Sequence, residues 1–328
     1  MAVLVTGGAG YIGSHTVAAL RERGEEIIIV DNMQQGHQEA LLAGKLYKGD
    51  LRDSDFMDVV FGENRIDAVI HFAANSLVGE SMKEPGKYYH NNVYGTLCLL
   101  EKMKQYNVGS IVFSSTAATY GEPENVPIDE YDRTLPTNAY GETKLAMEKM
   151  MKWYDVAHGI KYISLRYFNA AGAHESGAIG EDHSPETHLI PIVLEAALGK
   201  RPHISVFGED YDTPDGTCIR DYIHVSDLAD AHVLAVERLR GGADSSVYNL
   251  GNGKGFSVKE VIDIARSVTG RDIPAVMEPR RAGDPAVLVA SSERARKELG
   301  WSPSRNTLEQ IIASAWQWHS AHPEGYRK

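Results

Sequence analysis

Short apolar runs alternate with longer amphipathic stretches along the first half of the chain. The runs are AVLVT, EIIIVD, DAVIHFAA, SIVFSS and YISLRYFN, and each is followed by residues with helical spacing of apolar positions. Strands that alternate with helices in this way form βαβ units, in which a parallel sheet is covered by helices on both faces. The pattern therefore predicts an α/β protein with a doubly wound parallel sheet.

The regular alternation ends near residue 172. Beyond it proline and glycine become denser, in AAGAHESGAIGEDHSP and GEDYDTPDGT, although helical patterns continue in VSDLADAHVLAVERLR and SVKEVIDIARSVTG. We therefore expect a Rossmann-type domain over residues 1–172, to which part of residues 217–250 returns, and a smaller α/β lobe over residues 173–328. Ligands of such sheets bind outside the carboxyl ends of the strands, so functional residues are expected in the segments that follow them.

The charge balance narrows the class of partner. The 328 residues are 43% hydrophobic and carry a formal net charge of -12. Such a chain can bury a large core, but a partner such as nucleic acid or an anionic membrane needs a basic surface, so we expect neither. A small anionic molecule remains compatible with the composition, because a few local arginines are enough to bind it.

Cysteine and histidine give no metal or disulfide pattern. Cys98 and Cys218 lie 120 residues apart, and none of the 13 histidines belongs to an H-E-x-x-H sequence, so no metal is expected. The first apolar run begins at Ala2, which leaves no room for a signal peptide, and no apolar run approaches about 18 residues. We therefore expect a cytoplasmic protein.

The segment VTGGAGYIGSH follows the first predicted strand and opens a helix. Its glycines Gly7, Gly10 and Gly13 have the spacing G-x-x-G-x-x-G. Glycines let the backbone turn tightly and approach a pyrophosphate, while the amino terminus of the helix offers free amides and a positive dipole. The segment therefore predicts a dinucleotide-binding loop.

The end of the second predicted strand indicates which dinucleotide binds. Asp31 lies 18 residues after Gly13, where a carboxylate accepts hydrogen bonds from ribose hydroxyls and repels a 2′-phosphate. Asn32 and Met33 supply no replacement cation, so NAD is favoured over NADP. Asp50, in GDLRD, fits a contact to adenine and a role as a loop or cap residue equally well.

The segment TNAYGETKLAMEK places Tyr140 and Lys144 four positions apart in a helical pattern. Such residues share one helix face, with Cβ atoms about 5–6 Å apart, and a nearby cation lowers the pKa of a phenol by roughly 1–3 units. Chance alone gives about one such pair among 16 tyrosines, so the spacing does not establish catalysis by itself.

The predicted nicotinamide site gives this pair more weight. Ser114, Ser115 and Thr116 place hydroxyls at the end of the fourth run, shortly before the Tyr140 helix. A hydroxyl, a phenol and an ammonium that converge on a nicotinamide can move a proton together with a hydride. Thr116 alone fits an ordinary strand position equally well.

Seven motifs, in this order and over nearly the whole chain, carry a family resemblance: TGGAGYIG, HFAA, FSSTAATYG, YGETK, LRYFNAAGA, IRDYIHVSDLADAH and RRAGD. The chain resembles the extended short-chain dehydrogenase/reductases, and within them the branch that epimerises UDP-sugars at carbon 4. The resemblance implies that residues 1–172 bind NAD, that residues 173–328 bind a UDP-sugar, and that the protein interconverts UDP-galactose and UDP-glucose.

The resemblance also assigns roles to single residues. The implied catalytic residues are Tyr140, Lys144 and Thr116. The implied NAD-binding residues are Gly7, Gly10, Tyr11, Ile12, Gly13, Asp31, Asn32, Asp50, Leu51, Phe72, Ala73, Asn91, Ser114, Tyr140, Lys144 and Tyr167. The implied substrate-binding residues are Thr116, Phe168, Asn169, His188, Leu189, Val206, Phe207, Arg220, Tyr222, Arg281, Asp284 and Leu288.

The charge pattern agrees with a UDP-sugar substrate. A diphosphate with about two negative charges is best held by a forked guanidinium, which Arg220 or Arg281 would provide in an otherwise acidic protein. A solvated basic turn remains the alternative for PRRAGD. The rival functions are a nucleotide-sugar 4,6-dehydratase or decarboxylase and a non-catalytic NAD-binding regulator. Where dehydratases of the family carry an Asp-Glu pair, this chain has Ala117 and Ala118.

Two positions depart from the family or vary within it. Ser76 stands where many members have a lysine near the nicotinamide, so Tyr140 is expected to depend more on Lys144. Leu288 stands at a gate where tyrosine is associated with excluding N-acetylated sugars, so we expect some activity on UDP-N-acetylglucosamine. Members are commonly homodimers through helices such as PGKYYHNNVYGTLCLLEKMKQ, whose apolar positions fit the domain's own core equally well.

Overall fold

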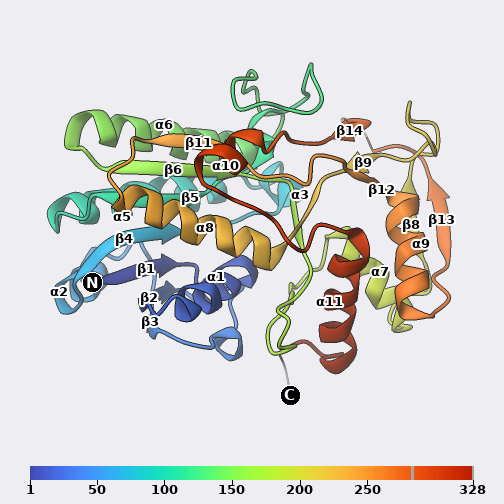
Figure 1. Cartoon of the computed structure of the whole chain (residues 1–328), viewed down its shortest axis with the longest axis horizontal. Coiled ribbons are helices and arrows are strands. Elements are labelled where there is room, and N and C mark those ends of the chain that lie inside the picture. Colours follow the sequence, from blue (N-terminus) through green and yellow to red (C-terminus); the bar gives the residue numbers. More distant parts are fainter. Residues whose placement is uncertain (282–283, 327–328) are drawn as a thin grey trace.

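The central sheet is parallel and belongs to the Rossmann type. The structure, a computed structural model, describes residues 1–281 and 284–326, and within them seven strands pair in the order β11-β6-β5-β4-β1-β2-β3 (Figure 1). The strands are β1 (Ala2–Thr6), β2 (Glu26–Asp31), β3 (Lys45–Lys48), β4 (Ile66–His71), β5 (Ser110–Ser114), β6 (Lys161–Arg166) and β11 (Ser246–Asn249). The predicted fold class is confirmed.

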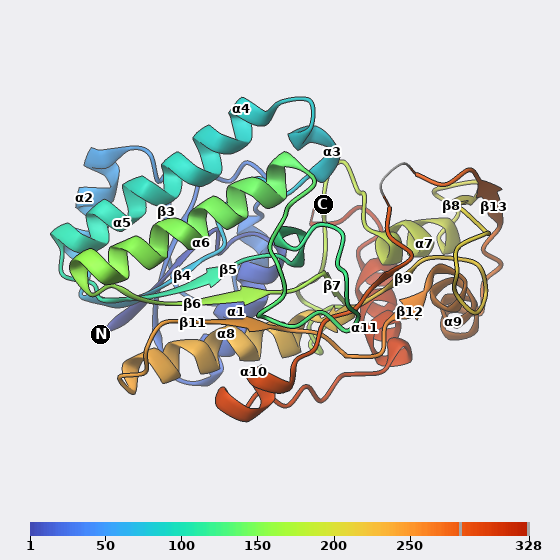
Figure 2. The same ribbon diagram turned by 90° about the horizontal axis from the view of Figure 1, so that it is seen from above.

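Helices cover both faces of this sheet because successive strand residues point to opposite sides. Val3 and Val5 of β1 pack on the side of α1 (Tyr11–Glu22) and α8 (Val225–Arg240). Leu4 packs in the second core, with residues of the helices on the other face. These helices are α2 (Ser54–Glu63), α5 (Gly95–Gln105) and α6 (Ala139–His158), and α5 and α6 lie side by side in Figure 2.

The chain returns to the sheet after leaving it. Strand β11 pairs in parallel with β6, from Ser246 opposite Ile163 to Asn249 opposite Arg166. Helix α8, which precedes β11, packs against α1 and the first core. The sheet layer therefore includes residues from well beyond position 172.

A smaller lobe stands at the end toward which the strands run (Figure 1). Its core contains Val193 and Leu194 of α7, Val206 of β8 and Ile311 of α11. Three small sheets pair as β10-β7, β12-β9-β14 and β13-β8. The elements of the lobe are β7 (Asn169–Ala171), α7 (Leu189–Ala197), β8 (Ile204–Phe207), β9 (Ile219–Arg220), β10 (Tyr222–His224), β12 (Phe256–Ser257), α9 (Val258–Thr269), β13 (Ala275–Glu278), β14 (Val287–Leu288) and α11 (Leu308–Ala321). Helix α10 (Glu293–Glu298) packs instead against β11 and the first core.

Short helical pieces connect the larger elements. They are η1 (Gln38–Ala40), α3 (Val78–Ser81), α4 (Pro85–Tyr88), the π-helix η2 (Tyr89–Tyr94) and η3 (Ala117–Thr119). The segment PGKYYHNNVYGTLCLLEKMKQ is thus a continuous run of α4, η2 and α5. Two residues of the RRAGD motif, Ala282 and Gly283, lie outside the described residues, as do the last two residues of the 173–328 lobe.

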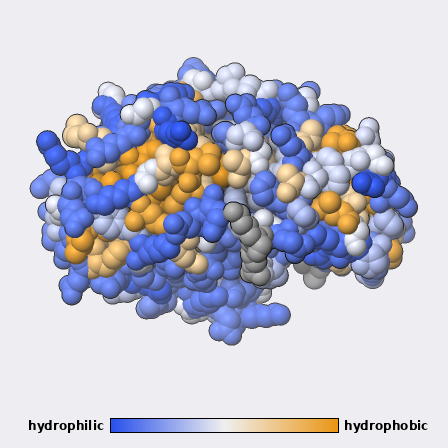
Figure 3. Space-filling view, turned by 90° about the horizontal axis from the view of Figure 1, so that it is seen from below, coloured by the Kyte–Doolittle hydropathy of each residue, from blue (hydrophilic) through white to orange (hydrophobic). Residues whose placement is uncertain are grey.

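The surface is mostly polar. Seen from below, apolar residues gather over the half of the molecule that holds the large sheet, with a smaller apolar area over the other half (Figure 3). None of the helices in the described part of the chain combines the length and the apolar character that a bilayer crossing requires.

Candidate active site

The glycine loop is a tight turn, a cradle for a phosphate group whose backbone leaves no room for side chains at Gly7 and Gly13. Gly7 has a φ of +73°, and a Cβ there would lie 2.6 Å from the backbone nitrogen of Ala73. A Cβ on Gly13 would collide with the carbonyl oxygen of Gly7. Helix α1 begins just after Gly10, and no side chain caps its first amides. These amides and the helix dipole suit a pyrophosphate.

Asp31 ends β2 beside this loop. Its Oδ2 accepts a hydrogen bond from the amide of Ala9 at 2.9 Å, and its Oδ1 accepts one from the amide of Met33 at 2.8 Å. Burial raises the pKa of Asp31, and the two amides oppose that rise. A carboxylate accepts about four hydrogen bonds, so the carboxylate retains capacity for ribose hydroxyls.

Asp50 is held by its own loop. Arg52 donates to it through Nε at 2.7 Å and through Nη2 at 2.5 Å, and this pairing lowers the pKa of Asp50 to about 2. Asn32 also hydrogen-bonds this carboxyl group. Leu51 is buried in the core beside α2. Asp50 therefore has the predicted role as a loop residue, because it bonds Arg52 within its own loop. Its contact to adenine stays a prediction.

The remaining predicted NAD residues surround the ends of β1 and β4. The amides of Phe72 and Ala73 donate to the carbonyl of Thr6 at 2.9 and 3.1 Å, which places the end of β4 against the glycine loop. Tyr11 donates through its hydroxyl to the carbonyl of Gly172 at 2.6 Å. Asn91 donates to the side chain of its neighbour at 3.1 Å. Ile12 is partly buried against the first core.

The predicted helix with Tyr140 and Lys144 is α6. Asn138 caps it by accepting from the amide of Gly141 at 2.8 Å, so Tyr140 lies in the first turn. Lys144 is 3% exposed, and its Nζ donates to the carbonyl of Ser114 at 2.7 Å. The same Nζ lies 5.9 Å from the centre of the Tyr140 ring. The pair therefore faces the end of β5.

Burial governs the protonation of both groups. It raises the pKa of Tyr140 to about 12, although hydrogen bonding by Thr116 lowers it. Burial lowers the pKa of Lys144 to about 7, against the influence of Glu148. Desolvation disfavours the phenolate in the chain alone, and the ammonium of Lys144 bonds a carbonyl, so the expectation that Lys144 lowers the pKa of the phenol stays a prediction.

Three hydroxyl groups lie at the carboxyl end of β5, on Ser114, Ser115 and Thr116. Thr116 is 7% exposed and caps η3, with its Oγ1 accepting from the amide of Ala118 at 3.1 Å. The hydroxyls of Ser114 and Tyr167 lie 2.5 Å apart. Ser114, Thr116, Tyr140 and Tyr167 are thus gathered at the carboxyl ends of β5 and β6.

A buried ion pair beneath these hydroxyls was missed from the sequence. Glu148 accepts from Ser115 Oγ at 2.5 Å and from Arg166 through Nε at 2.9 Å and Nη2 at 2.5 Å. Arg166 also donates to the hydroxyl of Tyr120 at 2.9 Å. The pair anchors the segment that carries Thr116.

Two predicted substrate residues meet beside Thr116. Phe168, which follows β6, and Leu288, in β14, both pack against the small cluster of Ala117, Tyr120 and Ile128. The cluster brings the proposed gate into contact with the segment that follows β5.

Asn169 and Tyr222 lie opposite each other in the pair β7 and β10. The side chain of Asn169 donates to the carbonyl of Asp221 at 3.1 Å. Tyr222 is 4% exposed, and burial raises its pKa. These residues connect the sheet domain to the smaller lobe.

Both predicted guanidinium groups are already oriented by neighbours. Arg220 forms an ion pair with Asp284 and lies opposite Leu288 in the pairing of β9 with β14. The guanidinium carbon of Arg281 lies 3.9 Å from the centre of the Phe207 ring. Val206, the neighbour of Phe207 in β8, is buried in the lobe core.

His188 directly precedes α7, and Leu189 is the first residue of that helix. His188 Nδ1 lies 2.9 Å from Glu186 Oε1 and 3.1 Å from Glu181 Oε1. Burial lowers the pKa of His188, but the two carboxylates outweigh it and raise that pKa to about 10. Leu189 packs against the lobe core.

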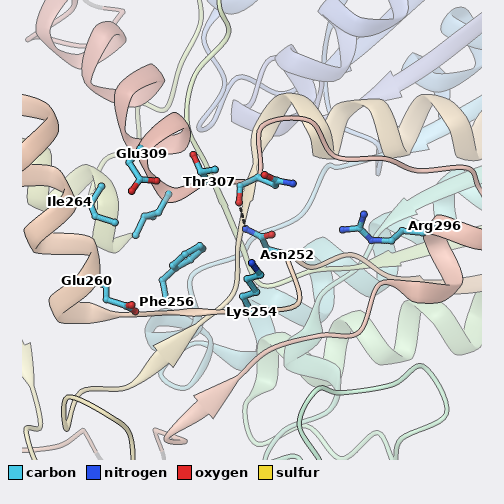
Figure 4. Close-up of a pocket in the computed structure, with 10 residues that line it drawn as sticks. Asn252, Lys254, Phe256, Glu260, Ile264, Arg296, Thr307 and Glu309 are labelled. Atoms are coloured by element: carbon cyan, nitrogen blue, oxygen red, sulfur yellow. Dashed lines mark hydrogen bonds between the residues drawn. The ribbon is translucent and has the colours of Figure 1, made fainter.

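Two observations lie apart from this arrangement. Position 76 is an exposed serine, so its own side chain supplies no cation. A cavity of about 440 Å³ lies among α9, α11 and the residues near Arg296, where Asn252 bonds the carbonyl of Asn306 (Figure 4). Its lining includes none of the predicted site residues, so it gives no support to them.

Comparison with known proteins decides the family. Residues 3–251 match the sequence model described as the NAD dependent epimerase/dehydratase family. The chain belongs to this family. A family relative from Halalkalibacterium halodurans, a UDP-glucose 4-epimerase, is 62% identical over 326 residues, which cover 99% of this chain and 98% of that protein.

Solved structures agree with this membership. A crystal structure of a UDP-glucose 4-epimerase is 57% identical, with a TM-score of 0.98 and coverage of 100% of both chains. The UDP-glucose 4-epimerase of Bifidobacterium longum, solved with NAD+ and UDP, is 44% identical with a TM-score of 0.93. That match covers 99% of this chain and 100% of the other. The family resemblance of the motifs is confirmed.

Proposed function

We propose that this protein is a UDP-glucose 4-epimerase, an isomerase that interconverts UDP-galactose and UDP-glucose with tightly held NAD. The observation that carries the proposal is the position of Tyr140 and Lys144 on α6. Lys144 bonds the last carbonyl of β5, and β5 pairs with β4, which pairs with β1 and its glycine loop. Tyr140 and Lys144 thus lie at the carboxyl ends of the parallel strands, as the glycine loop does.

The cradle fits NAD. A Cβ on Gly7 or Gly13 would collide with the backbone of Ala73 or of Gly7, so glycine is needed for the tight turn that lets a pyrophosphate approach the start of α1. Asp31 would accept the ribose hydroxyls, and Tyr11, Ile12, Phe72, Ala73 and Asn91 would line the remainder. When bound, NAD supplies the acceptor and donor of hydride at sugar C4 and a positive charge beside the phenol.

Tyr140 would move the proton. Its phenolate would take the proton from the 4-hydroxyl of the sugar and would return it to that same oxygen when hydride comes back to the opposite face of C4. Thr116 would relay this proton. Burial raises the pKa of Tyr140, so the chain alone keeps the phenol neutral. Lys144 holds its ammonium between the Ser114 carbonyl and the ring, where it would also contact the nicotinamide ribose.

The smaller lobe would hold the UDP part of the substrate. Arg220 and Arg281 would be the cations that bind the diphosphate. Asp284 orients Arg220 through an ion pair, and the ring of Phe207 orients Arg281. Asn169, Tyr222, His188, Leu189 and Val206 would complete the nucleotide site. Binding energy placed on the nucleotide leaves the hexose free to turn and to present both faces at C4.

Substrate breadth would depend on Leu288. Its side chain is smaller than tyrosine and packs beside Phe168, next to the segment of Thr116. We infer that the pocket admits the N-acetyl group of UDP-N-acetylglucosamine and its galacto epimer, with lower efficiency than the unmodified hexoses.

The outer faces of η2, α5 and α6 support a homodimer. Tyr94, Leu97 and Trp153 are 46%, 37% and 65% exposed there. Large apolar side chains that gather on adjacent helices are typical of a protein interface. The cytoplasm is the proposed compartment, because Cys98 and Cys218 are both unpaired, as is usual in a reducing environment.

The direct test is turnover without added cofactor. Purified protein incubated with UDP-galactose alone should produce UDP-glucose, and Tyr140→Phe should lose about 10²–10⁴-fold in kcat while keeping its NAD. Tyr131→Phe is the matched control, because Tyr131 is 83% exposed, and it should keep the wild-type rate. A Tyr140→Phe enzyme with the wild-type rate would remove Tyr140 from this role.

A further inference from the structure

Four side chains of the loop between β7 and α7 converge on one point. They are Glu181, His183, Glu186 and His188, and their donor atoms all lie within 4.8 Å of one another. Their sequence spacing, E-x-H-x-x-E-x-H, matches none of the patterns used to exclude a metal from the sequence. The proposed function accounts only for His188, which leaves the other three without a role.

The cluster is built around buried carboxylates. The side chains of Glu181 and Glu186 are 4% and 6% exposed. Among residues 1–281 and 284–326, the only basic groups in ion-pair contact with Glu181 are the imidazoles of His183 and His188. Buried carboxylates are rare unless they are paired or coordinate a metal, so this pair of glutamates needs a positive charge.

The nitrogen of His183 is directed into the cluster without a hydrogen-bond partner. Its Nδ1 is fully buried and makes no hydrogen bond. It nevertheless lies 3.1 Å from Glu181 Oε1 and 3.7 Å from Glu186 Oε2. An N–H donor would align with one oxygen, whereas a metal ligand points between its neighbours toward a shared centre.

We propose that Glu181, His183, Glu186 and His188 bind one divalent transition-metal ion, with Zn²⁺ as the best match. Ligands at about 2.1 Å around tetrahedral zinc lie about 3.4 Å from one another. The measured separations between oxygens and Nδ1 atoms run from 2.9 to 3.7 Å. Small side-chain adjustments would therefore complete the coordination.

The donor set selects the class of metal. Two imidazole nitrogens and two carboxylate oxygens suit zinc and its first-row neighbours, while magnesium and calcium prefer oxygen ligands throughout. Glu186 is already oriented, because its Oε1 accepts from the amides of Thr187 and His188 at 2.7 and 2.8 Å. A carboxylate fixed in this way loses little freedom when it coordinates an ion.

The position gives the ion a structural role between the two proposed binding sites. The ring of His183 meets the ring of Tyr11, in α1, edge to face with centres 6.0 Å apart. His188 directly precedes α7 and uses Nδ1 in the cluster, which leaves Nε2 outside it. The ion would tie the glycine-loop helix to the start of α7 and fix the orientation of His188.

The test measures metal rather than turnover, so it is independent of the proposed activity. Full-length protein with its NAD is treated with a chelator and titrated with Zn²⁺ by calorimetry, and Co²⁺ is added separately for absorption spectroscopy. One Zn²⁺ per chain and a tetrahedral Co²⁺ spectrum are expected. His183→Ala and Glu181→Gln should weaken Zn²⁺ binding by more than the roughly 10–100-fold lost when an outer-shell partner is changed.

Matched controls separate the cluster from surface binding. His203→Ala and Glu175→Gln change exposed residues outside the cluster and should bind Zn²⁺ as the wild type does. Near-ultraviolet circular dichroism of each variant shows whether it is folded, and Glu181→Gln keeps the shape of the side chain if His183→Ala does not fold. A wild-type protein without stoichiometric Zn²⁺ binding, or a folded His183→Ala with unchanged affinity, would overturn the proposal.

Discussion

Burial sets the chemistry of single side chains in this protein more strongly than sequence spacing does. The i, i+4 spacing correctly predicted that Tyr140 and Lys144 share one face of α6. Their pKa directions could not be predicted in the same way, because desolvation comes from segments distant in sequence. The hydroxyl of Ser81 accepts a hydrogen bond from the amide of Tyr140 at 3.1 Å, and the carbonyl of Ser114 accepts one from the ammonium of Lys144. The sequence identifies the pair, but only the fold determines its protonation.

His71 offers a test of burial through pH. It is 1% exposed at the end of β4, bonded to Thr6 and Thr96, and burial lowers its pKa to about 3. The unfolded chain takes up this proton near pH 6.5, so the native state loses stability as the pH falls below that value. At pH 5 the loss from this residue should be about 2 kcal/mol relative to pH 7.

The measurement is urea unfolding at both pH values. His71→Gln has no such titration and should lose about 2 kcal/mol less between pH 7 and pH 5 than the wild type does. His158→Gln, an exposed control at the end of α6, should follow the wild type. Equal pH dependence of His71→Gln and the wild type would show that His71 does not titrate differently on unfolding.

Leu288 is expected to set substrate breadth at the residue scale. Leu288→Tyr should abolish conversion of UDP-N-acetylglucosamine, because the larger side chain would take the space of the N-acetyl group. Conversion of UDP-galactose should stay within about threefold of wild type, a difference of less than about 1 kcal/mol. Leu135→Tyr, at an exposed position, should change neither rate. Equal losses on both sugars would show that Leu288 is no gate.

At the scale of elements, apolar runs predicted the buried strands and missed the edges. The five runs correspond to β1, β2, β4, β5 and β6. Strands β3, with the sequence KLYK, and β11, with SVYN, were not identified. Both lie at sheet edges and are partly exposed, so they carry polar residues and lack the continuous apolar character of central parallel strands.

The glycine loop gives an element-scale prediction. Gly13→Ala would force a Cβ against the carbonyl of Gly7, so the start of α1 should shift away from the pyrophosphate. We expect loss of bound NAD and about 1–3 kcal/mol of stability. The readouts are the absorbance of NAD released from purified protein and urea unfolding.

Gly86→Ala is the matched control for this loop. A Cβ at Gly86, in α4, meets nothing within 4 Å, so this variant should keep both its NAD and its stability. If Gly13→Ala retained NAD to the same extent as Gly86→Ala, the cradle would not be the NAD site.

At the scale of the whole molecule, the surface of α5 and α6 predicts assembly. Leu97→Glu places a charge among Tyr94, Leu97 and Trp153 and should shift the protein from dimer to monomer in light scattering. Val59→Glu introduces the same charge on α2, where Val59 is 50% exposed, and should leave the dimer intact. A Leu97→Glu dimer as stable as wild type would place the interface elsewhere.

The arrangement of the two lobes shows where sequence reasoning stops. The change in proline and glycine content near residue 172 was the signal for a boundary between two lobes, and that boundary stays a prediction. This signal could not predict the pairing of β8 with β13 or the Glu181 cluster, because short strands and loop side chains are brought together by long-range packing. That Arg220 and Asp284 lie at one site could be predicted only from the family motifs.

The fate of the hydrogen at sugar carbon 4 tests whether the hydride that leaves C4 is the same one that returns to it. Purified protein would be incubated with UDP-galactose deuterated at C4, in ordinary water without added NAD, and the UDP-glucose product examined by mass spectrometry and NMR. Retention of deuterium at C4 is predicted, because the hydride that leaves is returned within the same closed site. Replacement of that deuterium by solvent hydrogen would contradict the proposed mechanism.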